Sequence, residues 1–150
     1  MGDRAMAGRR GHPGTGWPES GLEVQAAVVV AAVRLGLWLL PLRSLHRWLG
    51  RLARLPRAPW EIGSPDRVAR AVTRASRWVP RATCLTQALA VRALLDRRGH
   101  PASVRIGVGR SRDGRLEGHA WVESGGRIVA GATELARHPP LCLLGPEVIE

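Results

Sequence analysis

Residues 83–101 read TCLTQALAVRALLDRRGHP and contain a complete predicted helix with a signal at each end. Thr83 can cap the N-terminus of this helix, Gly99 ends it and Pro101 follows. Counted from Cys84, the apolar residues recur after four, three and four positions, at Ala88, Val91 and Leu95. We therefore predict a helix over residues 84–98 whose first-turn thiol lies on the stripe that faces the core.

Beyond Pro101 the apolar pattern changes from a helical period to alternation. Apolar side chains alternate from Val104 to Val108, and a second alternating run over residues 117–123 places His119 and Trp121 on one face. Glycine-containing turns follow each run, and residues 127–130 can return as a third strand. The Cys84 helix is thus expected to pack on a small antiparallel meander.

Two further helical regions precede this core. Apolar residues at helical spacing on both sides of Pro41 predict a helical hairpin or a kinked helix over residues 20–55, with Ser20 as its cap. A second helix begins at Ser64-Pro65-Asp66, where Ser64 can cap, and its apolar stripe continues to Val79. We expect a flexible tail over residues 1–19, an N-terminal helical segment over residues 20–60 and the core over residues 61–150.

The composition excludes several classes of protein. A single domain fits 150 residues, and 45% hydrophobic with 23% charged residues argues against global disorder. The two cysteines are too few for a disulfide framework and lack zinc-binding spacing, so we expect free thiols in the cytoplasm and neither metal nor cofactor. The apolar run over residues 26–42 is interrupted by Arg34, so a buried or partner-facing helix is favoured over membrane association.

The formal net charge is +11, and all 23 basic residues are arginines. A biased genome can contribute to such a composition, so the charge permits an anionic partner without proving one. Four of these arginines form a stripe opposite the apolar face of the second predicted helix: Arg67, Arg70, Arg74 and Arg77. This stripe is either a docking surface for an acidic peptide or phosphates, or a solvated helix face.

Cys84 and His119 are the candidate catalytic residues. The positive end of a helix dipole and nearby amide hydrogens favour the thiolate of a first-turn cysteine. A histidine on an adjacent strand can form an ion pair with that thiolate and later protonate a leaving amine. His119 lies mid-strand, whereas the other four histidines lie in the tail, on the early helix, at a helix end and in a loop: His12, His46, His100 and His138.

Three segments carry a family resemblance: Trp78-Val79-Pro80-Arg81-Ala82-Thr83-Cys84-Leu85, Arg97-Arg98-Gly99-His100-Pro101-Ala102 and Gly118-His119-Ala120-Trp121-Val122-Glu123. Together they resemble the transglutaminase-like cysteine peptidase core and, more narrowly, the stand-alone leader peptidases of lasso peptide biosynthesis. The resemblance covers roughly residues 64–144. It implies an α+β fold, in which N-terminal helices precede a transglutaminase/papain-like core built from a Cys-bearing helix on a small antiparallel sheet.

The resemblance also implies an activity. The enzyme would hydrolyse one peptide bond and remove the leader from a ribosomally made precursor, with Cys84 as nucleophile and His119 as proton shuttle. Amides at the start of the Cys84 helix would stabilise the oxyanion, with Gln87 as a weaker candidate. The implied partners are the precursor peptide and a separate leader-recognition protein, and the macrolactam-forming synthetase is a further candidate.

The third catalytic residue departs from the family pattern, which places a carboxylate on or just after the strand that follows the histidine. Residues 127–133 contain no Asp or Glu, and Glu134 is the first acid beyond them. Three hypotheses stay open: Glu134 reaches back, a backbone carbonyl or Thr133 orients the ring, or the enzyme is weakened. Glu123 shares the face of His119 but lies about 13 Å along the strand, so we expect it to support the fold.

Two other functions remain as alternatives. One is a non-catalytic nucleic-acid or scaffold protein with a basic surface, although the chain has no nucleic-acid motif and lacks Phe and Tyr for base stacking. The other is amide transfer to an amine on the same fold. Cys142, within an apolar run, is expected to be a packed strand or loop residue, and Trp121 to be either a core residue or a wall of the substrate cleft.

Overall fold

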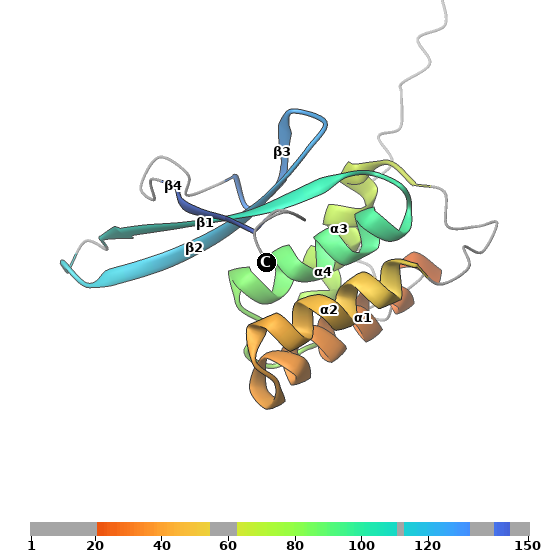
Figure 1. The fold of residues 1–150 in the computed structure, drawn as a ribbon, viewed down its shortest axis with the longest axis horizontal. Coiled ribbons are helices and arrows are strands. Elements are labelled where there is room, and N and C mark those ends of the chain that lie inside the picture. The colour runs from red at the N-terminus through yellow and green to blue at the C-terminus, as the bar shows by residue number, and fades with distance from the viewer. Residues whose placement is uncertain (1–20, 55–62, 111–112, 133–139, 145–150) are drawn as a thin grey trace, which may run out of the picture.

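A computed structural model describes residues 21–54, 63–110, 113–132 and 140–144, and these residues form an α+β fold. The helices are α1 (Gly21–Leu39), α2 (Leu42–Ala53), α3 (Pro65–Ser76) and α4 (Cys84–Arg97). The strands are β1 (Ala102–Arg110), β2 (Leu116–Ser124), β3 (Arg127–Ala130) and β4 (Pro140–Leu144). The helices gather on one side of the sheet (Figure 1), which confirms the predicted class of N-terminal helices followed by a Cys-bearing helix on a small antiparallel sheet.

The strands form one antiparallel sheet in the order β3-β2-β1-β4. β1 and β2 form a long hairpin, from the pair Ala102 and Ser124 to the pair Arg110 and Leu116. β4 adds to the other side of β1, where Cys142 lies opposite Ile106. The sequence did not distinguish β4 from a loop, because its short apolar run has no alternation and its partner strand is distant in the chain.

The first two helices form the predicted hairpin instead of one kinked helix. α1 closes with a hydrogen bond of 2.8 Å from the Leu40 amide to the Gly36 carbonyl. Pro41 has no amide hydrogen to continue the helix, and its carbonyl accepts hydrogen bonds from Ser44 and Leu45 at the start of α2. The predicted cap Ser20 lies outside the described residues.

A single hydrophobic cluster joins the helices to the sheet. It includes Val30 and Val33 of α1, Leu94 and Leu95 of α4 and Val122 of β2, all at most 1% exposed. One face of α1 is therefore part of the core, although the helix is long and apolar enough to cross a membrane. The opposite face of α1 is apolar and exposed at Val28 (64%), Leu35 (54%) and Trp38 (76%). The expected cytoplasmic location stays a prediction.

α3 begins where it was predicted but ends earlier. Ser64 occupies the predicted N-cap position, although its hydroxyl makes no capping hydrogen bond. Pro65 and Asp66 do occupy the first turn. The helix ends at Ser76 because residues 77–80 turn towards α4, and Val79 packs against the core from that turn. The predicted stripe is exposed along α3, with Arg67, Arg70, Arg74 and Arg77 opposite the buried Val68 and Val72.

Candidate active site

The chain enters α4 through a short turn that fixes the start of the helix. Arg81 adopts the left-handed conformation with φ 59°, and Thr83 then takes the N-cap position. The Thr83 hydroxyl accepts a hydrogen bond from the Thr86 amide at 3.3 Å, and the Thr86 hydroxyl accepts one from the Thr83 amide at 3.4 Å. This reciprocal capping box confirms the predicted cap and makes Cys84 the first residue of α4.

The capping box leaves two amides of the helix start unused. An α-helix begins with four amide hydrogens that have no partner within the helix. The box satisfies those of Thr83 and Thr86, whereas the amides of Cys84 and Leu85 make no hydrogen bond to any residue that the structure describes. These two amides lie at the positive end of the helix dipole, where a developing negative charge is stabilised.

The Cys84 thiol contacts β2 beside the candidate histidine. Its Sγ donates a hydrogen bond of 3.7 Å to the carbonyl of Gly118, the residue immediately before His119. The side chain is partly buried and packs against the hydrophobic cluster. The structure therefore places the thiol against the residue that precedes His119, where the N-terminus of α4 meets the first half of β2.

The His119 ring is held by a backbone carbonyl. Its Nε2 lies 2.8 Å from the carbonyl oxygen of Gly131, which follows β3. A carbonyl oxygen can only accept a hydrogen bond, so Nε2 carries the hydrogen in this contact. In the neutral ring, Nδ1 is then the nitrogen that can accept a proton.

Gly131 occupies a position that only glycine fits. Its φ is +80°, and a Cβ built there would lie 2.8 Å from the Ala120 carbonyl oxygen and 2.9 Å from the Trp121 Cα. The glycine thus lets the chain pass close over β2, where its carbonyl meets His119. One of the three hypotheses for the third catalytic group was a backbone carbonyl that orients the ring, and this contact is of that kind. Glu134 and Thr133 lie outside the described residues.

Trp121 and Glu123 stabilise the sheet behind the histidine. Trp121 is 1% exposed, and its ring is nearly parallel to that of His119, with the two centroids 6.4 Å apart. Its Nε1 donates to Glu123 Oε1 at 3.1 Å, and Glu123 Oε2 pairs with Arg105 Nε at 2.6 Å. Glu123 therefore supports the fold, as its distance along the strand suggested, and Trp121 is both buried and next to the candidate site.

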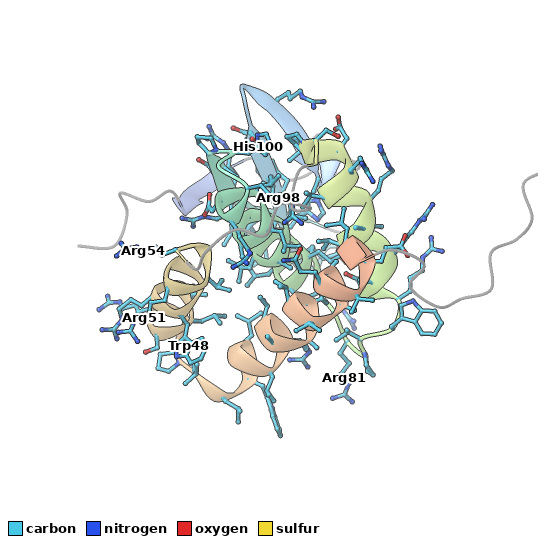
Figure 2. The ribbon with its side chains drawn as sticks, turned by 90° about the vertical axis from the view of Figure 1, so that its right-hand side faces the viewer. Trp48, Arg51, Arg54, Arg81, Arg98 and His100 are labelled. Atoms are coloured by element: carbon cyan, nitrogen blue, oxygen red, sulfur yellow. The ribbon has the colours of Figure 1, made fainter. Side chains whose placement is uncertain are left out.

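Among the other histidines, the one whose side chain the structure describes lies away from this site. His100 follows the opposite end of α4, where its Nε2 donates to the Gly63 carbonyl at 3.2 Å (Figure 2). His46 lies in α2, and His12 and His138 lie outside the described residues. The Gln87 side chain makes no hydrogen bond within the described part of the chain. The described residues contain no group of three or more His, Cys, Asp or Glu side chains that could hold a metal ion.

A cysteine at the start of a helix, packed on an antiparallel sheet beside a histidine, defines the class of α+β proteins with a Cys-His site. The comparison with family models agrees, because residues 27–141, from α1 into β4, match the model of the transglutaminase-like superfamily. The chain belongs to this superfamily, in which cysteine-type catalysis is common. No curated protein and no solved structure matches the chain significantly.

Proposed function

We propose that the protein is a cysteine peptidase that removes the leader from a ribosomally made lasso precursor peptide. The observation that carries the peptidase chemistry is the contact of the Cys84 thiol with the carbonyl next to His119, whose ring is held by Gly131. Membership of a superfamily that includes cysteine peptidases supports it. The lasso precursor as substrate rests on the resemblance of the three quoted segments.

In the proposed mechanism, His119 Nδ1 takes the proton of Cys84, and the thiolate attacks the scissile carbonyl. The oxyanion forms against the amides of Cys84 and Leu85. The protonated Nδ1 gives its proton to the leaving amine, and water then hydrolyses the thioester and returns the thiol. Throughout these steps Nε2 keeps its hydrogen and donates it to the Gly131 carbonyl, which fixes the orientation of the ring.

A separate recognition protein is part of this proposal. The described residues are occupied by the core and its supporting helices, and none of them forms an additional domain that could bind a leader. The exposed apolar face of α1, with Val28, Leu35 and Trp38, is a candidate surface for such a partner. Trp48 and Arg51 of α2 also point outward (Figure 2).

The test is cleavage of the precursor in the presence of the recognition protein, followed by mass spectrometry. Cys84→Ala is expected to abolish cleavage, since no other group replaces the nucleophile, while the far-ultraviolet circular dichroism spectrum stays unchanged. Cys142→Ala is the matched control and should retain cleavage. Normal cleavage by Cys84→Ala would reject the mechanism.

The same measurement separates hydrolysis from amide transfer. With an added primary amine, a peptidase releases the free acid, whereas a transferase releases an amide that is heavier than this acid by the mass of the amine minus one water. A predominant amide product would replace the hydrolase proposal with the transferase alternative.

A further inference from the structure

A groove of about 460 Å³ lies between α3 and β3, next to the candidate active site. One wall is a single face of α3, from Asp66 to Arg77. The other wall is formed by Ile128 of β3 and the residues that follow as far as Ala132. An arginine-bearing helix and a strand therefore bound the same open space.

The strand wall offers backbone groups for pairing. β3 is the outer strand of the described sheet and pairs with β2 on one side only. The outer edge of such a strand presents amide and carbonyl groups that can pair with another extended chain. Peptide recognition by addition of a strand to an exposed edge uses these groups for affinity and side-chain contacts for specificity.

The helix wall offers two arginines that form no ion pair with any described residue. Arg74 also lines the groove, and it pairs with Glu23 at 2.9 Å. Arg70 and Arg77 are exposed and make no ion pair with any residue in the described ranges. They lie seven residues apart, which is two helical turns or about 10 Å, so both can reach carboxylates on one extended chain that rises about 3.3 Å per residue.

The acidic residue of the groove is already neutralised. Asp66 accepts two hydrogen bonds from Arg127, at 3.2 and 2.8 Å. The Arg127 guanidinium holds the pKa of Asp66 below its usual range, chiefly through these hydrogen bonds. Arg70 lies close enough to Asp66 to lower its pKa further, and Arg70 and Arg77 are the groove arginines without an ion pair among the described residues.

The groove also ends at the candidate active site. Gly131 lines it, and the carbonyl of this residue holds His119. A chain that lies along β3 would thus pass Gly131, whose carbonyl holds the His119 ring. Nucleic acid fits less well, because the described residues that line the groove include no aromatic side chain for base stacking, and the strand edge is complementary to a peptide backbone.

We propose that this groove binds an acidic, extended segment of the peptide substrate as an added strand on β3, with Arg70 and Arg77 as the specificity-determining residues. This proposal rests on the proposed function in one respect, because it takes the bound segment to be part of the peptidase's substrate. It goes beyond a general basic surface, because it requires both backbone pairing with β3 and these two guanidinium groups.

The first test measures fluorescence anisotropy of a labelled synthetic peptide of alternating Glu and Thr. The protein is the full chain carrying Cys84→Ala, so that binding is measured without hydrolysis. The double variant Arg70→Glu/Arg77→Glu should weaken binding by about tenfold or more. The milder Arg70→Gln/Arg77→Gln should weaken it less, which covers any loss of folding in the charge-reversed protein.

The matched control is Arg43→Glu/Arg51→Glu, which makes the same change of net charge at exposed positions of α2. Its affinity should stay within about twofold of the parent protein. Equal losses for the groove and control variants, or no binding of the acidic peptide by the parent protein, would overturn the proposal. A polythymidine oligonucleotide that displaces the peptide at equal charge concentration would likewise show a general polyanion surface.

The second test addresses the added strand. Methylation of alternate peptide amides removes the hydrogen bonds on one side of an extended chain and leaves the other side intact. We expect one methylated register to lose binding and the other to retain it, whereas equal affinities would overturn strand addition. His119→Ala should lose cleavage but retain peptide binding, and this result would support the groove independently of the catalytic step. Loss of peptide binding by the groove variants, with the chemistry of Cys84 and His119 intact, would leave the catalytic assignment of both residues unaffected.

Discussion

Gly131 both turns the chain after β3 and supplies the carbonyl that holds His119. Its positive φ turns the chain after β3, and the absence of a side chain lets its backbone pass close to Ala120 and Trp121. The carbonyl that results from this path is the acceptor for His119 Nε2. In the proposed mechanism, this neutral carbonyl takes the orienting role that a carboxylate performs in other Cys-His systems.

We therefore predict that Gly131→Ala damages both stability and activity. Left-handed backbone strain and the clash of the new Cβ with β2 should lower the free energy of unfolding by about 2–4 kcal/mol. Displacement of the carbonyl should lower kcat more than it changes KM, because the ring and not the substrate contact is disturbed. Chemical denaturation and steady-state kinetics on the precursor peptide measure the two effects.

Gly126→Ala separates strain from displacement. Gly126 also has a positive φ, of 76°, but a Cβ there would meet no atom within 4 Å. This variant should lose only about 1–2 kcal/mol of stability and keep its kcat. If both alanine variants retained full activity at a temperature where they are folded, the orienting role of Gly131 would be wrong.

At the residue scale, the sequence indicated Cys84 and His119 through local signals, a helix start and an alternating strand. It left the third group open among Glu134, Thr133 and a backbone carbonyl. Which carbonyl reaches His119 depends on the pairing of β2 with β3, whose register shifts between Val122 and Glu123. No residue-type pattern reports such a shift, so Gly131 could not be selected in advance.

At the element scale, the junction of α1 and α2 depends on close packing at Gly36. A Cβ at this position would lie 2.6 Å from Leu45 Cδ1, and Leu45 is buried. Alanine normally stabilises a helix interior relative to glycine by about 0.5–1 kcal/mol. Overpacking against a buried side chain typically costs about 1–3 kcal/mol and outweighs that gain here.

We predict opposite effects at two helical glycines. Gly36→Ala should destabilise the protein by about 1 kcal/mol, whereas Gly50→Ala in α2, where a Cβ meets nothing within 4 Å, should stabilise it by about 0.5–1 kcal/mol. Thermal and urea unfolding of the two variants tests this difference. Stabilisation by both substitutions would show that Leu45 moves aside at little cost.

Helical elements were easier to predict than the sheet. Pro41, the Thr83 cap and Gly99 are local signals, and α1, α2 and α4 follow them. α3 ended earlier than its apolar stripe because Val79 reaches the core from a turn, which periodicity alone cannot distinguish from a further helical turn. The sequence did not distinguish β4 from a loop, because its pairing with β1 is a long-range interaction.

At the scale of the whole molecule, the N-terminal helices share their core with α3, α4 and the sheet. Burial of Val30, Val33 and Leu45 alone contributes about 1.5–3 kcal/mol per side chain. α1 and α2 thus contribute buried side chains to the core that they share with α3, α4 and the sheet, wherever a domain boundary is placed.

A fragment of residues 63–150 is therefore expected to lose cooperative unfolding. Without α1 and α2 it would expose the apolar faces of α3 and α4, which should increase binding of a hydrophobic dye. Addition of a peptide spanning residues 20–55 should restore part of the native near-ultraviolet circular dichroism. Cooperative unfolding of the fragment at the midpoint of the full chain would instead support an independent core, as the division at residues 60 and 61 predicts.

The sequence by itself determined the elements whose signals are local: the helix that begins at Cys84, the strand that carries His119, and the break at Pro41. It also indicated the transglutaminase-like class, because the motifs and their order can be read directly from the sequence. The tertiary structure alone decided that the thiol meets the carbonyl before His119, that Gly131 holds the ring, and that Arg70 and Arg77 face an open strand edge. These contacts join residues distant in sequence, and their geometry depends on strand register and helix packing, which no local pattern specifies.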